Sequence, residues 1–253
     1  MGLTIHYSLQ AQPRTTKAQA HTIVESLHQC ATSLLNEGML VQVSPILQAT
    51  TRTIESYVAD KESEWNWAAV QSSVLIKLGT APYQSFQGVT PVEGYLFRTW
   101  AGEGSEAANF GLMRYPKRID IEPSRPGQAK QSVPTGLSGW RWSSFCKTTY
   151  AIQPVAAHLA VIAMLDYAAS LPELTIAVSD EGEYWETRDV VTLAQNFAED
   201  AVMLAGLAHA LGPSAVAPIR ERGDYDDLVE RSTTYQQTFE ILKKIIDKST
   251  QDS

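Results

Sequence analysis

Residues 3–9 read LTIHYSL, a stretch in which apolar and polar side chains alternate without a break. Successive side chains of a β-strand point to opposite faces, so the two kinds of residue separate. One face would carry Leu3, Ile5, Tyr7 and Leu9, and the other Thr4, His6 and Ser8. The stretch predicts a strand with one buried and one polar face.

The residues that follow predict a helix and a second strand. Thr16 and Gln19 have the spacing of a capping box at a helix start. Apolar residues then recur at helical spacing until Gly38, a typical helix end. The stretch MLVQVSPIL (39–47) predicts another strand, which its proline places at a sheet edge or stops early. Together they predict a strand–helix–strand unit.

Glycine and proline divide the centre of the chain into short segments that favour strands. These predicted strands are 68–79, 94–102, 108–116 and 140–151. Short connections between strands favour antiparallel pairing. The segment 116–139 contains several prolines and glycines and no periodicity, which predicts a functional or flexible loop.

The second half of the chain predicts helices around one strand. Pro154 suits the first turn of a helix that runs to about Ser170. The apolar run LTIAVS (174–179) predicts a central strand buried on both faces, and an apolar stripe predicts a helix over 189–211. Two segments follow, a linker at 214–223 and an amphipathic helix at 225–247.

These elements predict an α+β fold. Residues 1–212 form a single domain with a mixed β-sheet flanked by helices. Residues 213–253 form the linker and an additional C-terminal amphipathic helix. That helix either packs back on the domain or docks on a protein partner.

The composition is that of an ordinary globular protein. Among 253 residues, 20 Lys+Arg face 28 Asp+Glu, and the net charge of −8 makes nucleic acid an unlikely partner, although a local basic patch is compatible with it. Two cysteines, Cys30 and Cys146, fit a reducing compartment and exclude a disulfide framework. Neither a signal peptide nor an apolar run of membrane-spanning length is visible, so we expect a soluble, cytoplasmic protein without a membrane partner.

The stretch SDEGEYWETRD (179–189) concentrates carboxylates directly after the predicted buried strand. Because ligands bind beyond the carboxyl ends of strands in open α/β sheets, the position favours a site. The candidate catalytic residues are His6, Asp180, Glu181 and Glu183, and Asp180 and Glu181 are candidate ligands of Mg²⁺ or Mn²⁺. The alternatives are a plain turn before a helix and a satisfied sheet histidine.

Lys147, Trp185 and Arg188 are candidate ligand-binding residues. Lys147 shares a strand face with Arg141, but about 3.3 Å per residue puts them about 20 Å apart, so two solvated charges are the alternative to an anion site. Cys146 points away from Lys147 and is more simply a small buried residue than an activated nucleophile. Trp185 alternatively covers the strand edge.

Four stretches together carry a resemblance: MGLTIHY, GEGSEAANFGLMRYP, GWRWSSFCKTTYA and VSDEGEYWETRD. In these the chain resembles an uncharacterised family of bacterial hypothetical proteins, over most of residues 1–211. The resemblance implies a bacterial, soluble protein. No activity is attached to that family, so the resemblance gives no residue a catalytic role.

Two functional hypotheses follow. The first is a binding or regulatory protein that acts through a protein partner or a small ligand, favoured because catalytic signatures are missing and six tryptophans accompany long polar loops. The second is a small metal-assisted hydrolase that uses the acidic turn at 180–183 with His6.

Overall fold

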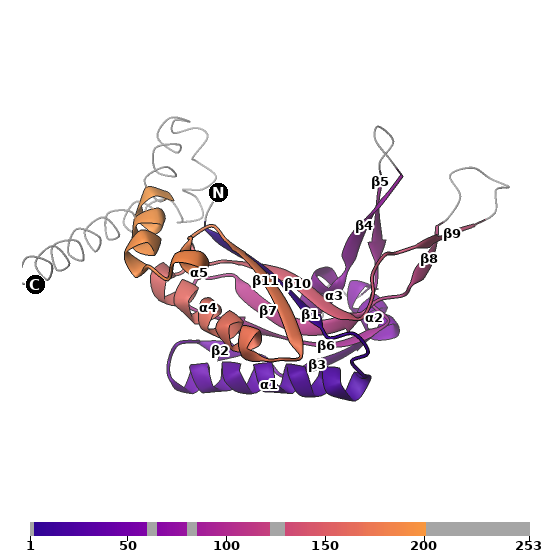
Figure 1. Ribbon diagram of the computed structural model, residues 1–253, viewed down its shortest axis with the longest axis horizontal. Coiled ribbons are helices and arrows are strands. Elements are labelled where there is room, and N and C mark those ends of the chain that lie inside the picture. Colours follow the sequence, from indigo (N-terminus) through magenta and orange to yellow (C-terminus); the bar gives the residue numbers. More distant parts are fainter. Residues whose placement is uncertain (1–2, 60–64, 80–84, 122–129, 201–253) are drawn as a thin grey trace, which may run out of the picture.

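The computed structural model describes residues 3–59, 65–79, 85–121 and 130–200 (Figure 1). Residues 190–200 are helical, in agreement with the start of the helix predicted over 189–211. The predicted linker and C-terminal helix lie outside the described residues. The division into segments 1–212 and 213–253 therefore stays a prediction.

A seven-stranded sheet forms the centre of the molecule, and every pairing between the described strands is antiparallel. Helices flank this sheet, so the predicted α+β class is confirmed. In spatial order the strands are β11 (Leu174–Asp180), β1 (Thr4–Ala11), β10 (Trp140–Lys147), β7 (Ala107–Arg114), β6 (Glu93–Trp100) and β2 (Gln42–Val43), with β3 (Leu47–Thr50) also paired to β6.

Strand β1 has the alternating burial that its sequence predicts. Ile5, Tyr7 and Leu9 are buried, whereas His6 and Gln10 are exposed. The strand lies between β10 and β11 and pairs with both. The first residues of the chain therefore hold together two segments from its second half.

Two helices cover one face of the sheet, here called the back face (Figure 1). They are α1 (Lys17–Asn36) and α4 (Pro154–Ser170). The predicted capping box at the start of α1 is confirmed, because Thr16 accepts from the Gln19 N–H while the Gln19 side chain accepts from the Thr16 N–H. On this face α1 presents buried apolar residues and aromatic contacts to β6: His21 lies against Tyr95 and His28 against Phe97.

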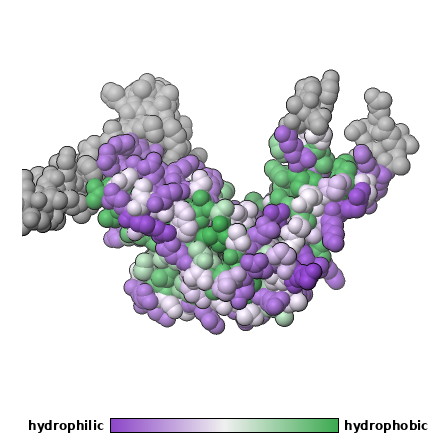
Figure 2. Space-filling model, viewed as in Figure 1, coloured by the Kyte–Doolittle hydropathy of each residue, from purple (hydrophilic) through white to green (hydrophobic). Residues whose placement is uncertain are grey.

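The opposite face is here called the open face, and the described helices that lie on it are grouped at one end. Helices α2 (Thr51–Ala59) and α3 (Asn66–Ser72) lie there, and Tyr115 at the end of β7 ties α3 down by donating from its hydroxyl to the Ser72 carbonyl at 2.8 Å. Beyond them two hairpins stand away from the sheet, β4 (Val74–Leu78) with β5 (Ser85–Val89) and β8 (Arg118–Ile121) with β9 (Gln131–Pro134) (Figure 1). The molecule is visibly hollowed between these hairpins and the end that carries α5 (Tyr184–Thr187) (Figure 2).

Four predicted segments take a different form. The stretch 174–179, predicted as a central strand buried on both faces, lies in β11 at the edge of the sheet, and most residues of β11 are exposed or half-buried. The predicted strand 68–79 is partly α3 and partly β4, because its first residues place Ala68, Ala69 and Ser72 on one buried helical side. The predicted strand 39–47 is split around Pro45 into β2 and β3, both of which pair with β6. The segment 116–139 contains the β8–β9 hairpin, whose short strands pair despite the prolines around them.

Strands β10 and β7 form backbone pairs at one end only, Trp140 with Arg114 and Arg141 with Met113. Farther along, side chains replace the ladder: the Tyr7 hydroxyl and the Trp142 indole both donate to the Asn109 carbonyl, at 2.7 and 2.6 Å. We call this region the seam. It joins the two halves of the sheet through buried side chains.

Candidate binding site on the open face of the sheet

A pocket of about 410 Å³ lies on the open face, at the point where α3 meets the sheet. Pockets of roughly 300–1,000 Å³ are typical of small-molecule sites. We call it the open-face pocket, and it is lined by Trp67, Gln71, Arg98, Trp100, Ser105, Glu106, Ala107, Asn109 and Phe145. Four elements and one connecting loop therefore meet here, from widely separated parts of the chain.

One wall of the pocket is a cation between two aromatic rings. Arg98 and Trp100 are two residues apart on β6, so their side chains share the open face. The Arg98 guanidinium lies 4.4 Å from the centre of the Trp100 ring and 4.8 Å from that of Trp67, which α3 supplies from the other side. Such contacts are favourable because the faces of aromatic rings are electron-rich. The guanidinium plane is thereby held in place.

Asn109 and Trp67 each bring to the pocket a buried polar atom that has no hydrogen-bond partner among the described residues. These atoms are the Oδ1 atom of Asn109 and the Nε1 atom of Trp67. Asn109 pairs with Arg98 across β7 and β6, is only 5% exposed, and uses its amide nitrogen in a long 3.4 Å bond to the Ala107 carbonyl. Leaving a buried acceptor or donor without a partner costs about 1–3 kcal/mol. Two residues of one pocket thus carry an acceptor and a donor that no described residue uses.

The rim of the pocket toward β10 is formed by Phe145 and the loop before β7. Phe145 is 42% exposed, and its ring lies 5.9 Å from that of His6 on β1. Glu106 holds the loop to β10, since its carboxylate accepts from the Lys147 N–H at 3.2 Å and its carbonyl accepts from the Cys146 thiol at 3.3 Å. Burial, with a smaller contribution from the Glu106 charge, raises the pKa of the Cys146 thiol to about 12, so this cysteine is not a thiolate nucleophile at neutral pH.

The predicted site at the acidic turn has a different geometry from the one expected. Strand β1 does lie beside β11, but His6 pairs with Ser179 while Asp180 pairs with Ile5. Adjacent strand residues face opposite sides of a sheet, so His6 lies on the open face and Asp180 on the back face. The expected convergence of His6 with Asp180 on one ion or substrate atom does not occur.

Asp180 instead belongs to a buried chain of hydrogen bonds. Its Oδ2 atom lies 3.0 Å from His158 Nε2, and His158 Nδ1 lies 3.0 Å from the Thr148 hydroxyl. The N–H groups of Gly182 and Trp185 also donate to the Asp180 carboxylate, at 2.7 and 2.9 Å. Burial alone would raise the pKa of Asp180, but His158 and these two N–H groups hold it below its ordinary value.

The arrangement of Thr148, His158 and Asp180 is that of a hydroxyl, an imidazole and a carboxylate in series. A nucleophile in such a series must be reachable by substrate. The side chains of His158 and Asp180 are fully buried, and Thr148 is likewise 0% exposed. The chain of bonds therefore ties Thr148, the residue after β10, to α4 and β11, and it fixes the start of the acidic turn.

The other candidate residues of the turn each have their own surroundings. Glu181 accepts from the Thr4 N–H at 2.9 Å, and Glu183 is an exposed residue with a left-handed backbone (φ 60°). Arg188 binds both Asp166 oxygens, at 2.7 and 2.8 Å, and stacks over Trp185 at 4.6 Å. Within the described ranges no group of three or more His, Cys, Asp or Glu side chains has the spacing of a metal site. The predicted Asp180–Glu181 site for Mg²⁺ or Mn²⁺ thus has no supporting ligand set there.

Lys147 and Arg141 lie on the same face of β10, as predicted, and this face is the open one. Sequence reasoning missed the pocket residues Trp67, Arg98 and Asn109. A partial signal was present, because Arg98 and Trp100 alternate with apolar residues along a predicted strand. Trp67 gives no such signal, since only the packing of α3 on the sheet brings it to β6.

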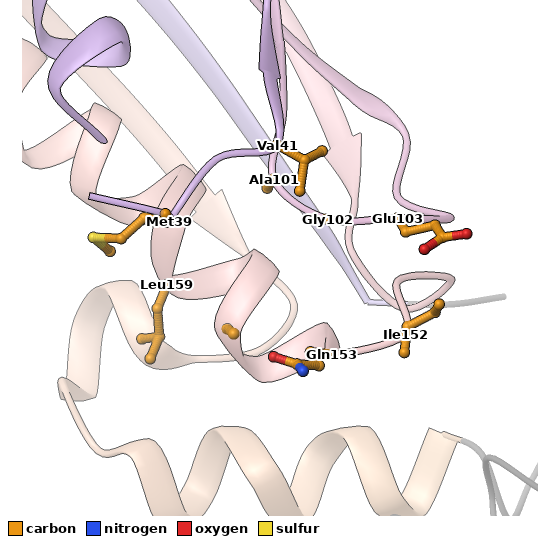
Figure 3. A pocket seen from close by; sticks show the side chains of 10 residues that line it. Met39, Val41, Ala101, Gly102, Glu103, Ile152, Gln153 and Leu159 are labelled. Atoms are coloured by element: carbon orange, nitrogen blue, oxygen red, sulfur yellow. The ribbon is translucent and has the colours of Figure 1, made fainter. Parts of the chain in front are cut away.

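A second pocket, of about 440 Å³, lies at the N-terminal end of α4 (Figure 3). Its lining is largely apolar and includes Met39, Val41, Leu159 and the exposed Ile152. None of the polar atoms that lack a partner among the described residues belongs to its lining. Its polar lining side chains, Glu103 and Gln153, therefore do not contribute a buried atom without a partner.

Of the helices that the structure describes, none combines the length and the hydropathy needed to cross a lipid bilayer. Comparison with known proteins found no matching family model, no matching curated protein and no matching solved structure. The resemblance to an uncharacterised bacterial family stays a prediction.

Proposed function

We propose that this chain is a cytoplasmic bacterial binding protein and that the open-face pocket holds its ligand. The observation that carries the proposal is the pair of partnerless buried atoms, Asn109 Oδ1 and Trp67 Nε1, in a pocket of ligand size. Folded proteins satisfy nearly all their buried polar atoms, so an acceptor and a donor left open in the same pocket suit an external group. The cysteine content and the bacterial resemblance support the proposed origin and compartment.

The pocket favours binding over catalysis. Among its lining residues the ionisable groups are Arg98, which is stacked between two rings, and Glu106, which holds the Lys147 N–H. Neither has the paired acid and base that hydrolysis requires. The hydrolase hypothesis also lacks its central contact, because Asp180 is bonded to His158 on the back face.

The test is a fragment screen followed by nuclear magnetic resonance of the tryptophan indole groups. The chain has six tryptophans, so each indole N–H can be assigned by a single Trp→Phe substitution. We expect fragments that bind at millimolar concentration and shift the resonances of Trp67 and Trp100. The resonance of Trp185, at the acidic turn, serves as the internal reference and should not move.

Asn109→Leu is the decisive variant, because leucine has a similar volume and lacks the open acceptor. We expect this variant to lose the fragments while its free energy of unfolding stays equal or rises by about 1 kcal/mol, since a buried atom without a partner is removed. The matched control is Gln10→Leu, an amide-to-leucine change at an exposed position of the same face outside the pocket. Fragments that bind both variants equally, or no fragments at all, would overturn the proposal.

A further inference from the structure

The strand positions of the open face carry a charge opposite to that of the whole protein, and Glu106, in the loop before β7, adds a carboxylate at the rim of the pocket. The strand registers place the following side chains on the open face: Thr4, His6, Ser8 and Gln10 of β1; Gly94, Leu96, Arg98 and Trp100 of β6; Ala107, Asn109, Gly111 and Met113 of β7; Arg141, Ser143, Phe145 and Lys147 of β10; and Thr175, Ala177 and Ser179 of β11. These positions include three permanent cations and a histidine, and no carboxylate. A chain with a net charge of −8 thus presents one face whose strands carry only positive charge.

The cations surround an aromatic platform. Phe145 is two residues from Lys147 and four from Arg141 on the same face of β10, and its exposed ring lies beside that of His6. Strand residues two apart are about 6.6 Å apart along the backbone, so Lys147 is the nearer of the two β10 cations to Phe145 along the strand. The open-face pocket begins at the same ring, because Phe145 is one of its lining residues.

We infer that the ligand of the open face is a nucleotide unit, either free or within a single strand. A nucleotide combines a negative charge, a flat π surface and a base edge with both donors and acceptors. The open face has a counterpart for each: Lys147 or Arg141 for a phosphate, Phe145 for stacking, and Asn109 Oδ1 with Trp67 Nε1 for a base edge. Charged grooves with exposed aromatic rings are the usual way to bind single strands.

An acidic peptide satisfies only part of this surface. Its carboxylates would suit the cations, and a backbone N–H could donate to Asn109 Oδ1. Carboxylate and amide groups have no aromatic face, however, so stacking on Phe145 would be left unused. The inference rests on the proposed function, because it names the ligand class of the same pocket and extends the site along β10.

The test titrates the full-length protein into labelled oligothymidine and oligouridine of twelve nucleotides and measures their fluorescence anisotropy at several salt concentrations. We expect binding that weakens with salt, with a slope of about −1.4 to −2.8 for two to four phosphate contacts at about −0.7 each. Unlabelled adenosine and uridine monophosphates are added as competitors. Competition at similar concentration identifies a free nucleotide as the ligand, whereas binding of the oligomers alone identifies a single strand.

Two matched pairs of variants locate the binding. Phe145→Ala should weaken oligonucleotide binding by about tenfold through loss of stacking, whereas Phe86→Ala on the β4–β5 hairpin, where Phe86 is 67% exposed, should not change it. Lys147→Gln should weaken binding and flatten the salt slope, whereas Lys77→Gln on the hairpin should do neither. Equal effects within each pair would overturn the placement on the open face.

The failure of this inference differs from the failure of the proposed function. If neither oligonucleotides nor monophosphates bind while fragments still shift Trp67 and Trp100, the nucleotide class is wrong and the pocket remains a binding site. If labelled polyglutamate binds as tightly as the oligonucleotides and Phe145→Ala has no effect, an acidic partner replaces the nucleotide.

Discussion

The carboxylate of Asp180 is the most heavily bonded acidic group of the predicted site. It accepts from Gly182 and Trp185 and faces His158, with its side chain fully buried. Every one of these contacts uses the ionised carboxylate as an acceptor. A residue so placed contributes to the free energy of unfolding rather than to ligand chemistry.

We therefore expect Asp180→Asn to lower the free energy of unfolding at pH 7 by about 3 kcal/mol, because one member of a buried pair is lost. The folded-state pKa of Asp180 is below the ordinary 3.8, so its stabilisation is full above that pH and is lost as pH falls through the folded-state value. Urea unfolding between pH 7 and pH 3 should show the difference between wild type and variant narrowing in acid.

Glu181→Gln is the control, since Glu181 is exposed and makes one hydrogen bond to Thr4. Its effect should be below about 1 kcal/mol. The metal-assisted hydrolase hypothesis expects the opposite behaviour of Asp180→Asn, namely an intact fold and loss of stabilisation by Mg²⁺ or Mn²⁺. An Asp180→Asn variant as stable as wild type at every pH would support that hypothesis.

At the scale of elements, the acidic turn between β11 and α5 combines two unusual backbone positions. Gly182 is buried, and a Cβ atom there would lie 2.7 Å from Leu193 Cδ1 and 2.9 Å from His158 Cε1. The next residue, Glu183, adopts the left-handed conformation that favours glycine. The glycine is thus needed for space, one residue before the position where backbone strain favours glycine.

This predicts opposite effects of two exchanges in the turn. Glu183→Gly should raise the free energy of unfolding by up to about 1 kcal/mol. The left-handed backbone costs a non-glycine residue about 1–2 kcal/mol, and part of that gain is offset because glycine loses more conformational entropy on folding. Gly182→Ala should lower it, because His158 or Leu193 must move. Thermal unfolding of both variants checks the pair, and a stabilised Gly182→Ala variant would contradict the packing described here.

The sequence predicts helices and strands well where a pattern within a few residues determines them. It predicts them poorly where contacts with distant parts of the chain choose between helix and strand. Alternation in β1 and the Thr16–Gln19 spacing before α1 each predict the observed element, because strand and helix periodicity act within a few residues. The stretch 68–79 is ambiguous, since a short apolar run suits helix and strand alike. The partner of Asp180 was not predictable, because His158 comes from α4 and its polar role is hidden in an apolar helix.

The candidate site shows the same difference between features set by local pattern and features set by packing. The shared face of Lys147 and Arg141 follows from strand periodicity alone. The pocket beside them depends on Trp67, which reaches β6 only through the packing of α3. Acidic residues were the more visible signal in the sequence, whereas the partnerless polar atoms become visible only in three dimensions.

At the scale of the whole molecule, the β4–β5 hairpin stands away from the sheet and has two differently exposed sides (Figure 1). Leu75 and Phe86 are 70% and 67% exposed on one side of it, whereas Ile76 on the other side is 8% exposed. Substitutions on the two sides should therefore change the free energy of unfolding by different amounts.

We expect the double variant Leu75→Thr with Phe86→Thr to change the free energy of unfolding by less than about 0.5 kcal/mol, because exposed positions away from special features are tolerant. Ile76→Thr should cost about 2 kcal/mol, because a buried apolar group is replaced by a polar one. Chemical denaturation measures both. A double variant as unstable as Ile76→Thr would mean that something covers the exposed side in the native state.

The position of β1 between β10 and β11 determines the order in which the chain can fold during its synthesis. β1 leaves the ribosome before its two neighbours, which end at Lys147 and Asp180. Strands β6 and β7, which are consecutive, can pair as soon as both are made, because contacts close in sequence cost little entropy to form. The apolar side of β1 therefore has no strand partner until β10 has been translated, and it has both only after β11. The polar side chains of His6, Ser8 and Gln10 keep β1 hydrated until these partner strands have been made.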